Sequence, residues 1–370
     1  MVIQILPLIN GIYKKNRSEP KILMIKYLLL ILILLSLFST NLFSKVISVP
    51  KDYKKIQLAL DASIDGDTIL VSKGVYKENI DFYGKKVMLT SKYTHTGNKR
   101  FIKKTVIKGQ GDDPAVTFSS NEDSSSSVIG FTITGGEGSL GGGIFCSMAN
   151  PILKDLIIKE NESQKGGGIG LYSSSPVIKD VKIIKNTALS SGALFITGYS
   201  SPKITNVLLA NNKTYVNGGS ITVEEYSNPV FTNVTISDNG YPDKVHPMII
   251  QYFGEMNPTM VNGIHISNGS NVFIKSSIIY SEADLEVLFG EYGEGSSLTI
   301  SYSNLDGGKS SIIDKYNSGI LNWNEGNIVA DPKFVNPKKN NYSLQNTSPS
   351  INQGDPNGTI KNMGASLVWD

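Results

Sequence analysis

The sequence predicts an all-β protein: a right-handed parallel β-helix, a solenoid in which each coil contributes three short strands. Three observations support this prediction. A turn motif recurs along the middle of the chain, in copies that start 25, 26, 27 and 29 residues apart. Asn or Asp stands at two fixed offsets within every copy. The runs between these positions are short and β-branched, and none has the length of a helix.

Each copy of the repeat begins at a proline that follows Asn or Ser. The five prolines are Pro151, Pro176, Pro202, Pro229 and Pro258. Asn-Pro and Ser-Pro start turns, because the residue before proline is driven out of the helical region. Glycine blocks such as Gly141 to Gly143 precede the first two prolines and permit tight corners. We therefore expect a strand at the proline, a bend, a second strand, and a third strand that starts at the glycines.

Two columns of Asn and Asp side chains are predicted along the solenoid. The first lies four residues after each proline and holds Asp155, Asp180, Asn206, Asn233 and Asn262. The second lies ten residues after each proline and holds Asn161, Asn186, Asn212, Asn239 and Asn268. Asn and Asp tolerate left-handed backbone and bond to nearby main chain, and amides stacked at about 4.8 Å per coil also bond to each other. A leucine-rich repeat has a similar period, but it carries Leu where this chain carries Ile, Val, Thr and Gly.

Residues 1–44 are predicted to be an export leader. The apolar run Leu28 to Phe38 has 11 residues, which suits a signal-peptide core and falls short of the roughly 18 residues of a membrane span. Met24 makes a conventional start, so residues 1–23 are interpreted as a mis-assigned beginning. Cleavage would release a secreted or cell-surface protein. The alternative is an uncleaved leader that holds the solenoid on a membrane.

Charge and cysteine content exclude some classes of partner and of stabilisation. The whole chain carries a formal net charge of +3. Five basic residues and one acidic residue lie in the leader, so the rest of the chain is close to neutral. It lacks the basic face of a nucleic-acid binder, and we expect no nucleic-acid partner. The single cysteine, Cys146, cannot form an internal disulfide and is expected to be a small buried residue of a strand.

With the repeat established, the sequence resembles the secreted right-handed β-helix proteins of the pectin-lyase-like superfamily over nearly all of residues 46–365. Three regions carry the likeness: the opening run from Ile56 to Ile80, the glycine-rich coils, and the closing run from Trp323 to Gly354. The resemblance implies a short N-terminal capping helix.

The resemblance also divides the exported chain into three parts. It implies an N-terminal cap over residues 45–64, the coils over residues 65–320, and a closing segment over residues 321–370. An open solenoid end exposes strand edges and apolar core, which invites aggregation. We therefore expect the aromatic residues Trp323, Phe334 and Tyr342 to pack as part of a cap.

Members of this superfamily include pectate lyases, pectin methylesterases, polygalacturonases, other polysaccharide lyases and proteins without known activity. A lyase needs a base, commonly Arg or Lys, and a cation such as Ca²⁺ that neutralises the uronate. Arg100 is the single arginine after the leader, and it lies away from the regular coils. The paired Asp and Arg of the methylesterases and the carboxylates of a hydrolase are not recognisable. The run Asp81 to Gly84 resembles one methylesterase motif only superficially, because it falls in the first coil.

One column of aromatic side chains is a candidate for ligand binding. Its members lie three to six residues before successive prolines, and they are Tyr172, Tyr199, Tyr226 and Tyr252. Stacked along one edge of the solenoid, they would bind sugar rings face to face. The alternative is a structural tyrosine ladder at a turn.

A second group of candidates is acidic or titratable. Glu224, Glu225 and Glu255 lie at similar offsets in successive coils and would share Ca²⁺ or a sugar hydroxyl, unless they form a solvated corner. His246 lies in the longest insertion between coils, and insertions in repeats often project from the binding face.

Two functions of different kinds remain open. The first is an exported β-helix, carbohydrate-binding or surface-structural, without catalysis or an evident cofactor; its partner would be a polysaccharide or a cell-surface glycan. The second is a polysaccharide lyase of the pectate-lyase kind that acts on uronate-containing glycans. In that case Glu225, His246 and Glu255 are the catalytic candidates and Ca²⁺ is the expected cation. Fold alone does not choose between them.

Overall fold

The computed structural model describes residues 24–31, 44–215, 219–241, 261–281, 285–290, 295–317 and 319–367. The chain divides into two compact units, Met1–Lys45 and Val46–Asp370. In the first unit, residues 24–31 form a helix. None of the helices in these described ranges has the length and apolar character that a membrane crossing requires. Much of the predicted signal-peptide core lies outside the described residues, so the leader stays a prediction.

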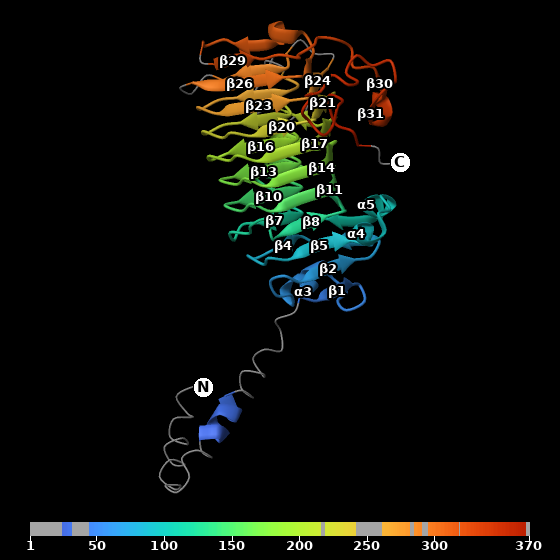
Figure 1. The fold of residues 1–370 in the computed structure, drawn as a ribbon, viewed down its shortest axis with the longest axis vertical. Helices are drawn as coiled ribbons and strands as arrows, with labels where there is room; N and C mark the ends of the chain where they lie inside the picture. The colour runs from blue at the N-terminus through green and yellow to red at the C-terminus, as the bar shows by residue number, and fades with distance from the viewer. Residues whose placement is uncertain are drawn as a thin grey trace. The chain divides into compact units, whose positions relative to one another are not determined.

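The second unit is a right-handed parallel β-helix, as the sequence predicted. The coils stack in about 10 turns, and each strand pairs in parallel with its counterpart in the next coil (Figure 1). The longest strands show this directly. β11 (Ile152–Lys159) pairs with β14 (Val177–Ile184), and β14 pairs with β17 (Lys203–Ala210), without a register shift.

Three parallel sheets run along the solenoid, and one antiparallel pair lies in the closing segment. Sheet A has 17 strands in the described part of the chain: β1 (Val46–Val49), β2 (Thr68–Val71), β3 (Gly74–Lys77), β5 (Met88–Ser91), β6 (Thr105–Lys108), β8 (Ser127–Ile129), β9 (Thr132–Thr134), β11, β14, β17, β20 (Val230–Thr232), β21 (Thr235–Ser237), β23 (Asn271–Lys275), β24 (Ile278–Tyr280), β26 (Ser296–Ser301), β27 (Asn304–Leu305) and β29 (Gly319–Trp323).

The other sheets are smaller. Sheet B has nine described strands: β4 (Ile80–Asp81), β7 (Val116–Phe118), β10 (Ile144–Ser147), β13 (Ile169–Tyr172), β16 (Leu194–Thr197), β19 (Ile221–Val223), β22 (Ile264–Ile266), β25 (Val287–Phe289) and β28 (Ile312–Asp314). Sheet C holds β12 (Glu162–Lys165), β15 (Thr187–Ser190) and β18 (Lys213–Thr214), and the antiparallel pair is β30 (Phe334–Asn336) with β31 (Asn341–Leu344).

Short helices and helical turns lie between some of the strands. They are α3 (Ile56–Asp61), α4 (Tyr93–Thr96), α5 (Arg100–Lys104) and the 3₁₀ turns η2 (Gly308–Ser311) and η3 (Pro337–Lys339). α3 is the predicted capping helix. It buries Ile56, Ala59 and Leu60 against the first coil, although β1 before it already pairs with β2.

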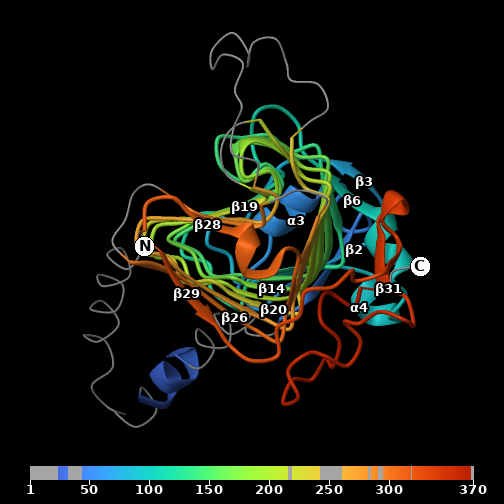
Figure 2. The same cartoon turned by 90° about the horizontal axis from the view of Figure 1, so that it is seen from above.

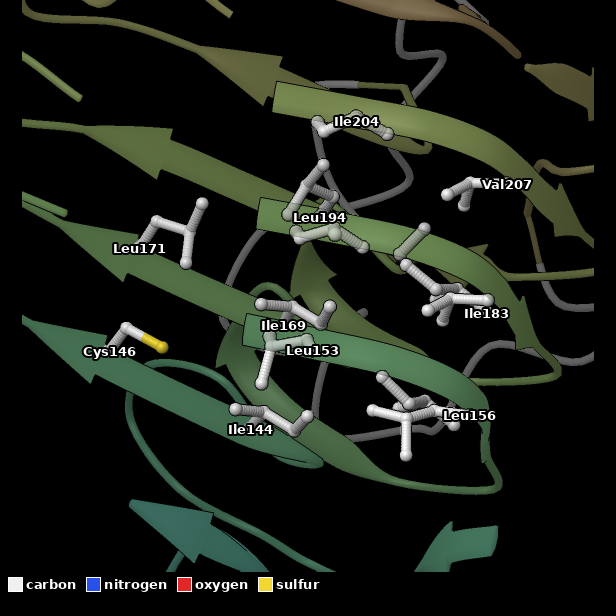
Figure 3. Close-up of a cluster of buried hydrophobic side chains, with 14 of the residues drawn as sticks. Ile144, Cys146, Leu153, Leu156, Ile169, Leu171, Ile183, Leu194, Ile204 and Val207 are labelled. Atoms are coloured by element: carbon white, nitrogen blue, oxygen red, sulfur yellow. The ribbon is translucent and has the colours of Figure 1, made fainter. Parts of the chain in front are cut away.

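The core is a file of aliphatic side chains inside the coils (Figure 3). Because neighbours along a strand point to opposite faces, alternate residues of β10 and β13 face inward. Ile144 pairs with Ile169, and Cys146 pairs with Leu171, so that like side chains stack on like. Cys146 is completely buried in this file, and burial raises the pKa of its thiol. It is a core residue, as its sequence context predicted.

The bend predicted four residues after the proline is present within the long strands. Asp155, Asp180 and Asn206 have φ values of 53°, 57° and 55°, in the left-handed region that Asp and Asn tolerate best among residues with a side chain. Each of these residues turns its strand from one side of the coil to the next, so that sheet A forms two sides of the solenoid (Figure 2).

The fifth copy of the repeat has a different register from the predicted one. Val230 of β20 pairs with Phe273 of β23, so the counterpart of Pro229 in the next coil is Val272. The predicted start of that copy, Pro258, lies outside the described residues. Asn262 and Asn268 therefore do not continue the two Asn columns. The physical reason is that an insertion separates the coils, and strand pairing rather than the Asn-Pro dipeptide sets the register.

The closing segment lies beside the coils on the outer face of sheet A, on the same side as α4 (Figure 2). Trp323 packs at the end of the main core, as a cap residue would. Phe334 and Tyr342 instead form a separate cluster with Leu208 and Ile278 on that outer face. Covering this face buries apolar side chains that point away from the solenoid interior.

Candidate functional site

Sheet B presents one continuous outward face along the solenoid, called here the sheet B face. It consists of the strand residues that point away from the core. Its first file contains Asp81, Thr117, Phe145, Gly170, Phe195, Thr222, His265 and Leu288, which pair one above another. Its second file contains Ser147, Tyr172 and Thr197. Phe195, Thr222 and Thr197 are almost completely buried, so a ligand would reach this face over its first coils, where Thr117 and Phe145 are partly exposed, and along the edge at Tyr172.

Two of the four predicted tyrosines stack on each other at the edge of this face. The rings of Tyr199 and Tyr226 lie with centroids 5.3 Å apart and an interplanar angle of 11°. They remain 73% and 52% exposed, so the ring faces are available to solvent. Stacked exposed rings of this kind suit contact with the apolar face of a sugar.

The predicted column of four tyrosines does not form as a single file. Tyr172 is the last residue of β13 and pairs with Thr197, so it lies two positions before the equivalent of Tyr199. It is nonetheless 45% exposed on the sheet B face, one coil away from the stacked pair. Tyr252 lies outside the described residues.

The backbone at the stacked tyrosines is in the left-handed region at two successive positions. Glu225 and Tyr226 have φ values of 56° and 58°, and Tyr199 has 60°. The hydrogen bond from Tyr226 N to Asn268 O aligns this turn with Asn268 and Gly269 in the next coil. Asn and Gly are the residues such a turn favours, so the turn geometry alone does not require a tyrosine.

The two described glutamates lie on the same face as the tyrosines. Thr197 Oγ1 donates to Glu225 Oε2 at 2.7 Å. Glu224 Oε1 lies 3.7 Å from Lys165 Nζ, and the same ammonium lies 4.6 Å from the centre of the Phe195 ring. Burial raises the pKa of Glu224, while the Lys165 charge opposes that shift. Glu224 is thus engaged by a cation of the protein.

The metal and catalytic predictions receive no complete constellation from the described residues. His246 and Glu255 lie outside them. Within the described ranges, no three His, Cys, Asp or Glu side chains are arranged to hold a metal ion. The Ca²⁺ site at Glu224, Glu225 and Glu255 and the lyase triad therefore stay predictions.

The second predicted column forms a hydrogen-bonded ladder of amides. Asn161 Nδ2 donates to Asn186 Oδ1 at 2.9 Å, Asn186 Nδ2 to Asn212 Oδ1 at 3.0 Å, and Asn212 Nδ2 to Asn239 Oδ1 at 3.0 Å. The left-handed residue at this corner is the one before each ladder asparagine, such as Lys185 with φ 58°. The ladder is structural, because these amides are buried and fully used within the protein.

The first predicted column bonds within itself in part, as a structural ladder would, and it also bonds to distant segments that the sequence did not suggest. Asn206 Nδ2 donates to Asp180 Oδ1 at 2.6 Å, and Asn206 Oδ1 accepts from Ser366 N at 2.7 Å. Asn233 Nδ2 donates to Asn362 O at 2.8 Å. Tyr93 Oη lies 3.3 Å from Asp155 Oδ1, and burial raises the pKa of that carboxyl. The column anchors the closing segment and the α4 insertion to sheet A.

A groove of ≈ 530 Å³ lies over the first coils of the sheet B face. Asp81, Thr117 and Phe145 form its floor, and Tyr83, Asp112 and Asp113 stand around it. Burial raises the pKa of Asp81, and the Glu122 charge adds to the shift. Sequence reasoning set aside the run Asp81 to Gly84 and so missed this groove. The available signal was an aromatic residue, Phe145, at the outward position of the strand that follows Gly-Gly-Gly.

A second groove of ≈ 470 Å³ lies on the outer face of sheet A. Its floor contains Ile157, Ile184 and Leu208, and its walls come from α5 and from the β30–β31 hairpin with the closing segment. Part of this apolar surface is covered by the closing segment itself. The grooves thus lie on two different sheets of the solenoid.

Comparisons with known proteins found distant solved structures and no matching family. No family model matches the chain, and no curated protein matches it. A solved pectin methylesterase in complex with a hexasaccharide is 12% identical, with a TM-score of 0.41, over 75% of this chain and 92% of that one. The pectate lyase Pel9A is 12% identical, with a TM-score of 0.42, over 87% and 96%. A pectin methylesterase from carrot is 12% identical, with a TM-score of 0.36, over 79% and 86%.

Proposed function

We propose that this protein is an exported, non-catalytic β-helix that binds a polysaccharide or cell-surface glycan, and that the sheet B face is its binding surface. The stacked pair of Tyr199 and Tyr226 is the observation that carries the proposal. Both rings are exposed, and they lie in a turn whose counterpart in the next coil is Asn-Gly. Aromatic side chains held in a left-handed backbone, where the turn itself favours smaller residues, are retained for their contacts.

The polar side chains around the rings suit hydroxyl recognition. Glu225 Oε2 accepts from Thr197, and a carboxylate has lone pairs left for a sugar hydroxyl. Tyr172 extends the aromatic surface toward the first coils. A linear glycan that lies along the solenoid axis would contact these groups in successive coils.

The lyase alternative stays open as a prediction. Its candidate Glu225 lies on the proposed binding face, whereas His246 and Glu255 lie outside the described residues. No described residue near Glu225 supplies an arginine, since the one arginine after the leader lies in α5.

Retention on immobilised polysaccharides tests the proposal. Tyr199→Asn together with Tyr226→Asn removes both rings and keeps residues that tolerate left-handed backbone. We expect the affinity for the retained glycan to fall about tenfold or more. Tyr53→Asn, which removes a tyrosine that is 36% exposed in the loop before α3, is the matched control and should leave affinity unchanged.

Two outcomes would overturn the proposal. One is a wild-type chain that binds no polysaccharide in a broad panel. The other is a double variant that folds and binds as well as the wild type, since the stack would then be a structural ladder. The same panel, incubated with Ca²⁺ and read for unsaturated uronate product, tests the lyase alternative, and product formation would replace the non-catalytic proposal.

A further inference from the structure

The groove over the first coils differs in charge from an ordinary mixed surface. Its described lining contains three carboxylates, Asp81, Asp112 and Asp113, and neither Lys nor Arg. A neighbouring hollow shares Asp112 with the groove and adds Glu137 and Glu162, again without a basic residue in its described lining. The two together form a continuous acidic depression beside the sheet B face.

Aromatic and hydroxyl groups accompany these carboxylates. Phe145 lies on the floor, and Tyr83, which is 66% exposed, stands at the edge with φ 47°. Thr117 and Ser139 contribute hydroxyls. A depression with apolar ring faces and a few convergent acceptors is the usual form of a small-ligand site. Carboxylates alone or an aromatic ring alone would not indicate a ligand site. Together in one groove they offer a ligand an apolar ring face and hydrogen-bond acceptors.

Other polar groups of the groove are already engaged and give it shape. Gln57 Nε2 donates to Asp81 O at 3.0 Å, and Asp81 N donates back to Gln57 Oε1 at 2.9 Å. Asn79 Nδ2 donates to Pro114 O at 3.0 Å. These bonds tie α3, β4 and the loop before β7 together, so the walls come from three segments held in place before any ligand arrives.

The groove continues the proposed binding surface. Phe145 pairs with Gly170, and Ser147 of the same strand pairs with Tyr172. Tyr172 therefore lies one coil above the groove on the same face. A glycan chain that contacts the tyrosines would extend over Phe145 into the acidic depression.

We propose that this groove is a subsite for uncharged sugar residues and that it excludes uronates. The inference rests on the proposed glycan-binding function and names its substrate class. Carboxylates accept hydrogen bonds from sugar hydroxyls, whereas a uronate would place like charges together without a cation of the protein to compensate. Discrimination of this kind arises from a repulsive element as much as from an attractive one.

Titration with two sets of oligosaccharides of equal length tests the inference. One set is neutral (cello-, xylo- and manno-oligosaccharides), and the other is acidic (oligogalacturonate and oligoguluronate). The wild-type chain should bind at least one neutral set and prefer it to both acidic sets. The preference should weaken as salt is raised, because the repulsion is screened.

Two variants locate the effect in the groove. Asp112→Asn with Asp113→Asn should raise the affinity for acidic oligosaccharides about fivefold at low salt, because two like charges are removed. Glu325→Gln with Asp331→Asn removes the same charge from two exposed residues of the closing segment and should leave the preference unchanged. Tyr83→Asn keeps a residue that tolerates the left-handed backbone and should weaken neutral binding alone.

The failure of this inference is distinct from failure of the proposed function. A chain that binds glycans through Tyr199 and Tyr226, yet prefers uronates, would overturn the inference and leave glycan binding intact. An unchanged preference in the Asp112 and Asp113 variant would do the same. A wild-type chain that binds neither set would overturn both.

Discussion

Replacing Asn186 with alanine removes one of the two inner asparagines of the amide ladder. The side chain is completely buried and is joined to both neighbouring coils. Its Oδ1 accepts from Asn161 N at 3.1 Å and from Asn161 Nδ2 at 2.9 Å. Its Nδ2 donates to Ile158 O and to Asn212 Oδ1, each at 3.0 Å. Alanine deletes all four of these bonds while leaving the backbone of residue 186 in place.

The expected cost follows from the groups left behind. The backbone N–H of Asn161 loses its acceptor inside the protein, and a buried donor without a partner costs about 1–3 kcal/mol. Asn161 Nδ2 keeps only a bond of 3.3 Å to Ile133 O. We therefore expect Asn186→Ala to lower the free energy of unfolding by about 2–4 kcal/mol. Asn322→Ala removes an exposed asparagine with a single bond of 3.2 Å to Thr299 and should cost less than about 0.5 kcal/mol.

Urea unfolding followed by far-ultraviolet circular dichroism measures both changes. Because a solenoid interacts mainly between neighbouring coils, the loss should also be visible locally. Amide hydrogen exchange should accelerate in β11 and β14 before it accelerates in β26 and β29. An Asn186→Ala protein within about 0.5 kcal/mol of wild type, with unchanged exchange in β11, would show that the ladder does not stabilise the coils.

Three further perturbations follow from other buried groups. Burial raises the pKa of Glu286 to about 8 from 4.5, and its Oε2 has no hydrogen-bond partner within the described part of the chain. The folded state therefore keeps a proton that the unfolded chain releases, so the free energy of unfolding should fall by about 2–4 kcal/mol as pH rises from about 5 to about 8. Urea titrations at several pH values measure this slope, and Glu286→Gln should flatten it. Tyr342 Oη donates to Asp238 at 2.6 Å and accepts from Asn211 at 2.9 Å. Tyr342→Phe should loosen the closing segment by about 1–3 kcal/mol, seen as faster proteolysis near β31 with the coils intact; equal proteolysis of both chains would contradict this. A Cβ at Gly167 would lie 2.5 Å from Thr187 O and 2.6 Å from Gly192 O. Gly167→Ala should therefore lower the free energy of unfolding by more than about 1 kcal/mol. Thermal melts that show no difference from the wild type would contradict this prediction.

The coils from Pro151 to Pro229 could be predicted because their determinants are local. Spacings of 25, 26 and 27 residues keep every turn, bend and ladder asparagine at a constant offset. The same locality explains the error in the next copy. Val272 rather than Pro258 is equivalent to Pro229, because an insertion lies between the paired strands β20 and β23. A short motif such as Asn-Pro does not indicate the length of that insertion.

The path of the closing segment depends on contacts between residues far apart in sequence. Ser366 N bonds to Asn206, and Ala365 N bonds to Thr235, across 160 and 130 residues. A signal was nevertheless present in the strands that this segment covers. The run Leu156-Ile157-Ile158 is apolar at both inward and outward positions, which is typical of a strand buried on both faces.

The candidate site was predictable in part for similar reasons. Tyr199 and Tyr226 stack because equivalent positions in adjacent coils must lie one above the other. Tyr172 could not be placed by its distance from the proline, because the turn from Thr197 to Pro202 is one residue longer than the turn from Tyr172 to Pro176. The acidic groove combines residues from α3, β4 and loops, and only the folded coils bring them together.

A crystal structure of the protein soaked with a neutral oligosaccharide tests the central claim most directly. The account predicts sugar rings against Tyr199 and Tyr226 or over Phe145, on the outward side of sheet B. Sugar bound instead in the groove between α5 and the β30–β31 hairpin, with the tyrosine faces bare, would contradict it.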